Sequence, residues 1–458
     1  MRTLLALALG WALLACSSAP SPSPSTGTPP DTSGGTSSKL TVTVLATGQA
    51  EAWGMQWPYQ LLRLQEDGKA AAYAQWFPPR KEGTWPAMLL TRPYDGISWT
   101  GEAVDAKWAA RGAGLHPDDS EPHYHEGSSV IAYAPVTPEA VAAESFFFLY
   151  HDFGVLAVFG RFYAGGDLQN DVDDMHAGFS FLAQAPGVDR SRVGIHGGSW
   201  GGFEALYAAA SAPAEVRPRV GVALYPLSDF TRQQDYLSAV VPSRVSDPVV
   251  RSQYSMFFEP YLRRVFATTG GTPGASGVDS TRWTHEYLAA AVDTPFLVIH
   301  EDWDSLIPVE QTRELASRLG QRLTPLYFQH PGAADWDTRA LDHGVLVSRY
   351  GHTLDTLATS HLLTRLGGDT QPLYVPVLQS SLVEWLREVR ALQASGRDVS
   401  DVAPRLRELT DPRVTLVELS DGNRAAGVDW VAAVVNAVWG TQYTRDTLRD
   451  ALASGLPR

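Results

Sequence analysis

The chain has 458 residues, of which 44% are hydrophobic and 19% are charged, so it can bury one large core with additions, or two domains. Its formal net charge of −14 argues against nucleic acid as a partner, because phosphate backbones are bound by clustered positive charge. The single cysteine, Cys16, excludes a disulfide within the chain and a thiolate metal cluster.

The first residues have the pattern of a bacterial lipoprotein signal. An apolar run at residues 4–15 is too short to span a bilayer but has the length of a signal-peptide core. Leu13-Leu-Ala-Cys16 resembles a lipobox, which implies cleavage before Cys16 and lipid attachment to its thiol. The alternative is an ordinary secretory signal. We expect residues 1–16 to be a lipoprotein signal peptide with its lipobox, and the protein to be lipid-anchored outside the cytoplasm, or secreted.

The sequence after the signal divides into a tether and a folded region. Residues 17–38 are rich in Ser, Pro, Thr and Gly and are expected to stay extended. From residue 39, apolar runs bounded by Gly and Pro alternate with segments of helical spacing. Strands are expected at 40–45, 71–77, 86–93, 154–160, 193–198, 220–225, 295–300 and 325–329. Helices are expected at 171–185, 203–212, 309–319 and 354–366. This alternation predicts an α/β-hydrolase type of fold over residues 39–368, with a mostly parallel sheet flanked by helices.

Two segments stand outside that alternation. The insertion at about 231–291 contains a capped helix start at Asp247-Pro248 and an aromatic helix at 254–266. We expect it to form a helical lid over the active site, with a packing-only excursion as the alternative. Residues 369–458 are expected to form a mainly helical C-terminal extension that packs against the main domain.

A serine in a glycine-rich turn is the centre of the predicted site. Gly197-x-Ser199-x-Gly201 joins an expected strand to an expected helix, which is the pattern of a nucleophile elbow. Small neighbours allow the sharp turn that exposes the serine hydroxyl. The backbone N–H of Trp200 is expected to bind the oxyanion. A second donor is expected in the loop after the strand at 86–93, where Tyr94 offers a hydroxyl, although packing is an alternative role for this residue.

The acid and the base are expected after later strands, in the order serine, acid, histidine. The loop after the strand at 295–300 favours Asp304 as the acid and leaves Asp302 as the alternative. The histidines after the next strand are His330, His343, His352 and His361. His343 is favoured because it leaves room for a loop before the closing helix, and His352 remains the alternative.

Together these features resemble the catalytic domain of the prolyl oligopeptidase family of serine peptidases, over roughly residues 86–366. The most specific stretch is 187–202, with its V-D-x-x-R-V phrase and its G-x-S-W-G-G elbow. Residues 225–230 are similar to the family's A-P-V-x-D-W, and residues 342–344 to its D-H-G. The resemblance implies a peptidase that cleaves short peptides through an acyl-enzyme, without a cofactor. Carried over, it implies the roles nucleophile, acid, base and oxyanion donor for Ser199, Asp304, His343 and Tyr94.

The chain also departs from the family. Glu301 stands where the family's H-G-x-x-D has glycine, and the roughly fifty residues between the tether and Pro86 are too few for the β-propeller that the family's peptidases usually carry. Arg92-Pro-Tyr94 is similar to acyl-ester hydrolases, so a carboxylesterase is the alternative function. An inactive binding lipoprotein on a hydrolase fold is the alternative of another class.

One stretch has metal-ligand residue types outside this site. Residues 116–126 contain three histidines and several carboxylates at spacings that a metal uses. Their proline and aspartate content indicates a solvated loop instead. We therefore expect no metal and no cofactor, and the expected partner is a small peptide or ester substrate.

Overall fold

The computed structural model describes residues 40–92, 97–99, 104–106, 138–160, 162, 167–252, 266, 271, 281–332, 336–339, 343 and 345–458. The expected signal peptide and tether, including Cys16, lie outside these residues, as do Tyr94, the stretch at 116–126 and most of the expected aromatic helix at 254–266. Among the described residues, none of the helices has the length and the hydropathy needed to cross a membrane.

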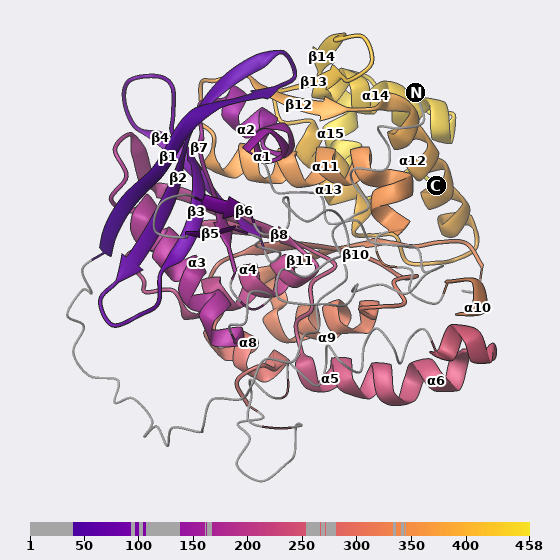
Figure 1. Ribbon diagram of the computed structural model, residues 1–458. Helices are drawn as coiled ribbons and strands as arrows, with labels where there is room; N and C mark the ends of the chain where they lie inside the picture. Colours follow the sequence, from indigo (N-terminus) through magenta and orange to yellow (C-terminus); the bar gives the residue numbers. More distant parts are fainter. Residues whose placement is uncertain are drawn as a thin grey trace.

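A nine-stranded sheet forms the centre of the described structure (Figure 1). Its spatial order is β1 (Leu40–Ala52), β2 (Met55–Glu66), β3 (Ala72–Phe77), β7 (Gly154–Phe159), β4 (Trp85–Arg92), β8 (Val188–Gly198), β9 (Val220–Leu224), β10 (Phe296–Glu301) and β11 (Leu323–Phe328). The first three strands pair antiparallel, and the six from β7 to β11 in this order run parallel. The predicted α/β-hydrolase class, with a mostly parallel sheet, is confirmed.

Helices cover both faces of this sheet, and each face has its own core. One core holds α3 (Leu168–Leu182), α4 (Trp200–Ser211), α8 (His285–Ala291) and α9 (Val309–Leu319). The other holds α11 (Val345–Leu366) together with α1 (Pro138–Glu144) and α2 (Phe146–Tyr150). All residues of β7 are buried, because helices cover both faces of the sheet at this strand. Its sequence is therefore an unbroken apolar run.

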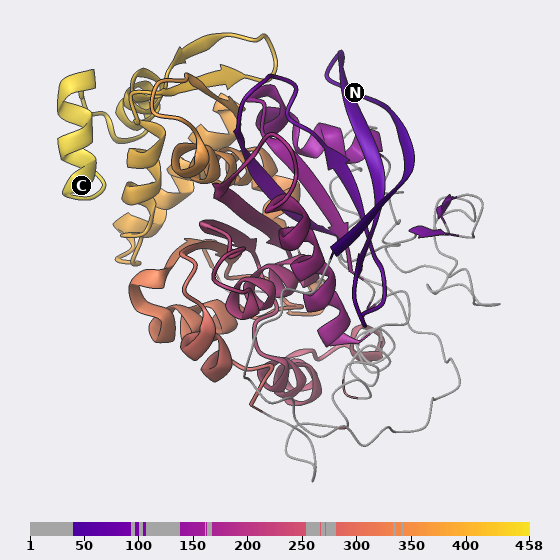
Figure 2. The ribbon, with the colours of Figure 1, turned by 90° about the vertical axis from the view of Figure 1, so that its left-hand side faces the viewer.

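The N-terminal hairpin differs from the expectation of one short strand at 40–45. β1 continues to Ala52, and β2 pairs with it in an antiparallel ladder. A small two-stranded sheet, β5 (Ile97–Trp99) and β6 (Val104–Ala106), was also not expected. The sequence pattern hides β2 because Pro58 interrupts its apolar residues. The sheet accommodates this proline because the ladder between β2 and β3 begins only at Gln60, so Pro58 faces β1 alone. Figure 2 shows this hairpin at the edge of the sheet.

The insertion after β9 is helical where the structure describes it. It begins with α5 (Phe230–Asp235), the π-helix η3 (Tyr236–Val240) and α6 (Val241–Arg244), and it returns to the sheet through α8. The expected cap is confirmed, because the Asp247 carboxylate accepts hydrogen bonds from the N–H groups of Val249 and Val250. A cover over the active site remains a prediction, because residues 253–265 lie outside the described part.

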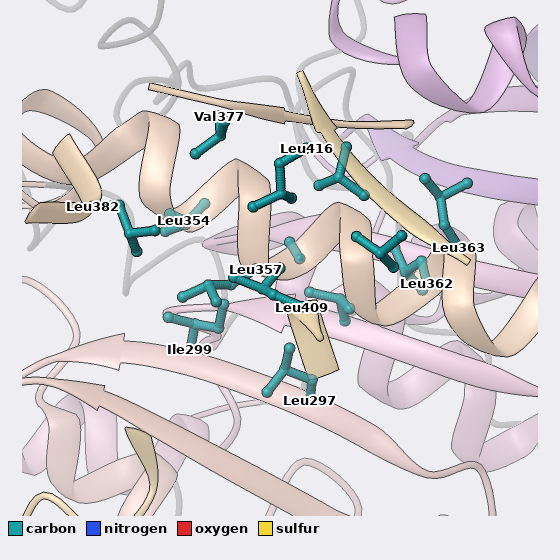
Figure 3. Close-up of a cluster of buried hydrophobic side chains, with 14 of the residues drawn as sticks. Leu297, Ile299, Leu354, Leu357, Leu362, Leu363, Val377, Leu382, Leu409 and Leu416 are labelled. Atoms are coloured by element: carbon teal, nitrogen blue, oxygen red, sulfur yellow. The ribbon is translucent and has the colours of Figure 1, made fainter. Parts of the chain in front are cut away.

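The C-terminal extension packs on α11 and contains strands as well as helices. It contains β12 (Leu373–Val377), α12 (Gln379–Ala394), α13 (Val402–Leu409), β13 (Val414–Glu418), β14 (Arg424–Ala426), α14 (Gly427–Trp439) and α15 (Arg445–Ala453). β12, β13 and β14 form a second sheet. Figure 3 shows leucines of α11 between Leu297 and Ile299 of β10 on one side and Val377 and Leu416 of the extension on the other.

Candidate active site

Ser199 lies at the turn between β8 and α4, in a strained backbone conformation. Its φ of 56° and ψ of −118° are rare for a residue with a side chain and cost about 1–3 kcal/mol. Two backbone hydrogen bonds hold the turn: the Ser199 N–H donates to the Leu224 carbonyl at 2.9 Å, and the Phe203 N–H donates to the Ser199 carbonyl at 3.2 Å. The parallel neighbour β9 thus fixes the conformation that presents the hydroxyl.

Glycines around Ser199 permit close backbone contacts. A Cβ at Gly197 would lie 2.2 Å from the Gly201 carbonyl oxygen and 2.2 Å from Thr91 Oγ1. A Cβ at Gly202 would lie 2.7 Å from the Cβ of Pro226. The expectation that the turn needs small neighbours is therefore confirmed at Gly197. Gly202 also has no room for a side chain, because Pro226, in the segment that follows β9, lies against it.

Three side chains from the ends of three parallel strands meet at this turn. Nε2 of His343 lies 2.8 Å from Oγ of Ser199, and Nδ1 of His343 lies 2.8 Å from Oδ2 of Asp304. Ser199 follows β8, Asp304 follows β10 and His343 follows β11, and all three are buried. The carboxyl ends of parallel strands share one edge of a sheet, so residues 144 positions apart come within hydrogen-bond distance there.

The environment of Asp304 keeps its carboxylate ionised. Oδ1 accepts hydrogen bonds from the N–H groups of Leu306 and Ile307, at 2.9 and 2.8 Å. Burial alone would raise the pKa of Asp304, but contacts with His343 and His300 more than offset it and lower the pKa to about 2. A permanently charged carboxylate can hold the imidazole in the tautomer that carries its proton on Nδ1.

The structure separates the alternatives from this group. Asp302 accepts a hydrogen bond from the N–H of His330 and lies 3.4 Å from Arg397 of the C-terminal extension. His352 is exposed on α11. The remaining two histidines are buried elsewhere: the ring of His330 stacks on Trp303, and His361 contacts Glu408 of α13.

Trp200, the residue after Ser199, is anchored by a buried carboxylate. Its indole Nε1 donates to Oδ2 of Asp171 at 2.8 Å, and the N–H of Phe162 donates to Oδ1 of the same residue at 2.6 Å. Burial, together with the charge of Asp171, raises the pKa of the neighbouring Glu204 carboxyl well above its ordinary range. The backbone N–H of Trp200 lies in the first turn of α4, where helix N–H groups point away from the helix.

One contact residue was missed by the sequence analysis. Tyr225 follows β9, has a φ of 36°, and places its ring at 82° to the His343 ring with 5.0 Å between centroids. Its N–H donates to the carbonyl of Ile299 at 2.6 Å. Tyr225 stands where the similar family motif has alanine, and that difference is the sequence signal by which it could have been found.

Among the described residues, no three potential metal ligands come together. The stretch at 116–126 lies outside those residues, so the structure provides no test of it. The groups that the described site brings together are a serine hydroxyl, an imidazole and a carboxylate.

Residues 161–331 match the model of the prolyl oligopeptidase family, which confirms over this segment the resemblance seen in the sequence. The segment includes Ser199 and Asp304 and ends before His343. No curated protein matches the chain.

Solved structures with a detectable likeness include both peptidases and esterases. A Mycobacterium tuberculosis puromycin-hydrolyzing peptidase is 16% identical, with a TM-score of 0.40 over 70% of this chain and 46% of the peptidase. The Porphyromonas gingivalis dipeptidyl peptidase 4 is 16% identical, with a TM-score of 0.37 over 59% of this chain and 32% of the peptidase. A Paenibacillus acetyl xylan esterase is 15% identical, with a TM-score of 0.39 over 64% of this chain and 85% of the esterase. The chain thus spans less than half the length of these two peptidases.

Proposed function

We propose that this chain, in which residues 161–331 match the prolyl oligopeptidase family, is a serine hydrolase that cleaves short peptides through an acyl-enzyme. The observation that carries the proposal is the hydrogen-bonded series Ser199–His343–Asp304, with 2.8 Å at each step. A serine becomes a nucleophile when a neighbouring base removes its proton and a third group orients that base.

The proposed reaction follows from these contacts. Ser199 Oγ attacks the substrate carbonyl while its proton passes to Nε2 of His343. The ionised Asp304 stabilises the imidazolium that forms. The backbone N–H of Trp200 and the Tyr94 hydroxyl are the proposed donors to the oxyanion, each worth on the order of 3 kcal/mol in the barrier. His343 then protonates the leaving amine, and water releases the acid from Ser199.

A carboxylesterase is the second candidate, favoured by the strands before β4. In the described structure, β1, β2 and β3 all belong to the main sheet. The residues between the tether and β4 therefore form strands of the hydrolase sheet and not a β-propeller. A propeller is the part that would restrict entry to short peptides. An inactive binding protein is disfavoured, because a histidine lies within hydrogen-bond distance of Ser199.

In this proposal the reaction takes place outside the cytoplasm. The predicted lipidation of Cys16 and the predicted tether at 17–38 would hold the hydrolase near a membrane surface, or an ordinary signal would release it. The substrate is then a small extracytoplasmic peptide or ester.

The test compares substrates and variants in one assay. The mature protein is given a proline-containing aminoacyl amide and a chromogenic acyl ester, and Ser199→Ala and His343→Ala are measured beside it. We expect amide cleavage by the wild type and a fall of about 10³–10⁶-fold in kcat in both variants. His352→Ala is the matched control, because this histidine is exposed, and it should retain activity.

Each outcome selects one function. Ester cleavage without amide cleavage would make the carboxylesterase the correct assignment. If neither substrate is cleaved and a fluorophosphonate probe leaves Ser199 unlabelled, the enzyme proposal is wrong and binding becomes the better account.

A further inference from the structure

The insertion after β9 makes two hydrogen bonds to the loop that carries Asp304. Nε2 of Gln233, in α5, donates to the carbonyl of Leu306 at 2.7 Å. The hydroxyl of Tyr236, the first residue of η3, donates to the carbonyl of Ser305 at 2.9 Å. Both side chains are buried, with exposed fractions of 1% and 6%, so water does not compete for these bonds.

The same loop is held from its other side by Asp304 itself. The carboxylate accepts from the N–H groups of Leu306 and Ile307, while the insertion binds the carbonyls of Ser305 and Leu306. The peptide groups next to Asp304 are therefore fixed in both directions. If the bonds from the insertion are lost, the carboxylate's own contacts and the contact of His300 Nε2 with the Ile307 carbonyl at 2.9 Å still hold part of the loop. The carbonyls of Ser305 and Leu306 lose the two donors of the insertion, so Oδ2 can drift from Nδ1 of His343.

The orientation of the Gln233 amide is determined by α9. Oε1 of Gln233 accepts from Nε2 of Gln311 at 2.7 Å, so Nε2 of Gln233 faces Leu306. Oε1 of Gln311 in turn accepts from the N–H groups of Ser228 and Asp229, at 2.9 Å each. The two glutamines thus connect the start of the insertion to the acid loop without an unpaired polar group between them.

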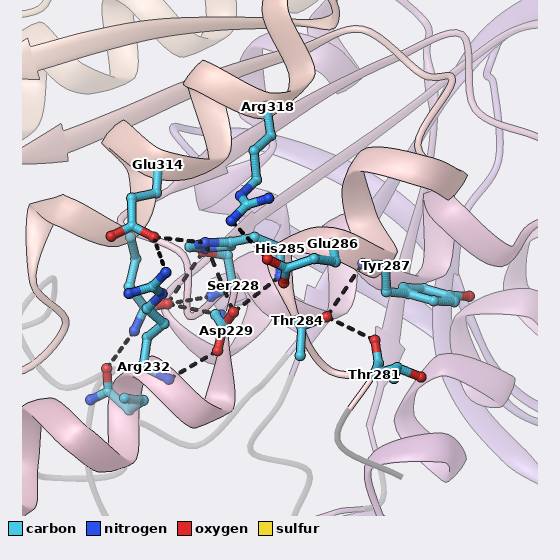
Figure 4. Close-up of polar contacts among 12 residues, drawn as sticks. Ser228, Asp229, Arg232, Thr281, Thr284, His285, Glu286, Tyr287, Glu314 and Arg318 are labelled. Carbon is cyan, nitrogen blue, oxygen red and sulfur yellow. Dashed lines mark hydrogen bonds and ion pairs between the residues drawn. The ribbon is translucent and has the colours of Figure 1, made fainter. Parts of the chain in front are cut away.

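The two ends of the insertion meet at this point, as Figure 4 shows. The Asp229 carboxylate accepts from the N–H of Arg232, at the start of α5, and from the N–H of His285, at the start of α8. Oγ of Ser228 lies 2.9 Å from Nε2 of His285. These hydrogen bonds join the start of α5 to the start of α8. A displacement of either end of the insertion therefore also moves Gln233 and Tyr236.

We infer that Gln233 and Tyr236 are positioning residues for the triad acid, through which the insertion controls hydrolysis. This rests on the proposed function, since it assigns Asp304 the role of orienting His343. On this inference the insertion acts on the chemical step and not only on access to the site. A misplacement of about 1 Å at a reacting group costs up to about 100-fold in rate.

The test uses two tyrosines of the same network. Tyr236→Phe removes the hydroxyl bound to the acid loop, and Tyr207→Phe removes a hydroxyl that donates to the Ser228 carbonyl at 2.8 Å. Both hydroxyls are buried, so both variants should lose similar stability in thermal unfolding. We expect kcat to fall at least about tenfold in Tyr236→Phe with KM within about twofold, and to stay within about twofold in Tyr207→Phe. Gln233→Met should behave like Tyr236→Phe.

A second readout does not depend on turnover. A short hydrogen bond to Asp304 shifts the Nδ1 proton of His343 far downfield in the proton NMR spectrum. This resonance should weaken or move in Tyr236→Phe and stay in place in Tyr207→Phe. Equal kcat and an unchanged resonance in both variants would overturn the inference, and so would an effect confined to KM. If the resonance responds as expected in a protein that neither cleaves substrate nor labels with the probe, the positioning stands and the proposed function fails.

Discussion

Two carboxylates only two residues apart, Asp302 and Asp304, have different environments. Asp304 receives two backbone N–H groups and lies beside His343 and His300, which lower its pKa to about 2 despite its burial. Burial raises the pKa of Asp302, which faces the backbone of His330 and Arg397 instead. Sequence spacing favoured Asp304, but only these contacts separate the two.

Asp304→Asn is therefore expected to lower kcat by about 10³–10⁴-fold with the fold intact, because an amide can stabilise the wrong tautomer of His343. The measurement is kcat on the better of the two substrates, with circular dichroism to verify folding.

The carboxylate of Asp304 also contributes to the free energy of unfolding. This contribution is present above pH about 4 and is lost only as the pH falls through about 2, the folded-state pKa. Lowering the pH from 7 to 4 should therefore leave Asp304 ionised.

Asp302→Asn is the matched control, with the same change of charge two residues away. It should retain kcat within a few fold, because in the described structure Asp302 binds the backbone of His330 and Arg397 of the C-terminal extension. If Asp302→Asn loses as much activity as Asp304→Asn, the assignment of the acid is wrong.

At the scale of an element, the elbow depends on where a side chain can fit. A Cβ at Gly197 would lie 2.2 Å from a backbone oxygen of α4, which cannot move without displacing Ser199. A Cβ at Gly198, one residue later, would meet nothing closer than 3.4 Å, the hydroxyl of Tyr225. The two glycines look alike in the sequence motif, and only one is required by packing.

Gly197→Ala should therefore reduce fluorophosphonate labelling of Ser199 by at least about 100-fold, since the nucleophile would be displaced by a fraction of an ångström or more. Gly198→Ala should label within a few fold of the wild-type rate, because it meets only ordinary van der Waals contacts. The rates are measured at one probe concentration under native conditions. Labelling of both variants at the wild-type rate would show that the elbow tolerates a Cβ at both positions.

Elements with strong local patterns were predictable from the sequence, and elements that depend on distant partners were not. The helix at 309–319 was predicted with its observed bounds, because Pro308 and Gly320 mark its ends. The closing helix begins at Val345 and not at 354, since non-helical torsions at Tyr350 interrupt the periodicity. β12 was not predicted, because it is a short strand that forms only by pairing with β13 about forty residues later.

The same distinction holds for the site. The order of the strands and the spacing of the loops led to Ser199, Asp304 and His343, which the structure brings together. Gln233 and Tyr236 could not be found this way. Their hydrogen bonds join segments about seventy residues apart, and no short motif records such a contact.

At the scale of the whole molecule, an ionic network joins the C-terminal extension to the hydrolase. His361 and Arg365 of α11 contact Glu408 of α13, and Arg405 of α13 contacts both His361 and Glu408. Burial lowers the pKa of His361 to about 4, although Glu408 acts in the opposite direction. The extension therefore covers α11 through a histidine that is neutral in the folded state near pH 7.

This network predicts a specific loss of stability in acid. Between pH about 6.5 and about 4, the unfolded chain takes up a proton on His361 that the folded chain does not, so the free energy of unfolding falls as the pH falls. The full shift is worth on the order of 3 kcal/mol. His361→Gln keeps a donor and an acceptor for Glu408 and Arg405 but cannot titrate. In urea unfolding, the stability of the wild type relative to His361→Gln should therefore decrease by roughly 2–3 kcal/mol from pH 7 to pH 4.

The control for this last prediction is His352→Gln, which removes an exposed histidine from the same helix. Its stability relative to the wild type should stay constant over the same pH range. A parallel fall in wild type and His361→Gln would mean that His361 takes up its proton at the same pH in the folded and the unfolded chain, and that burial does not control its titration.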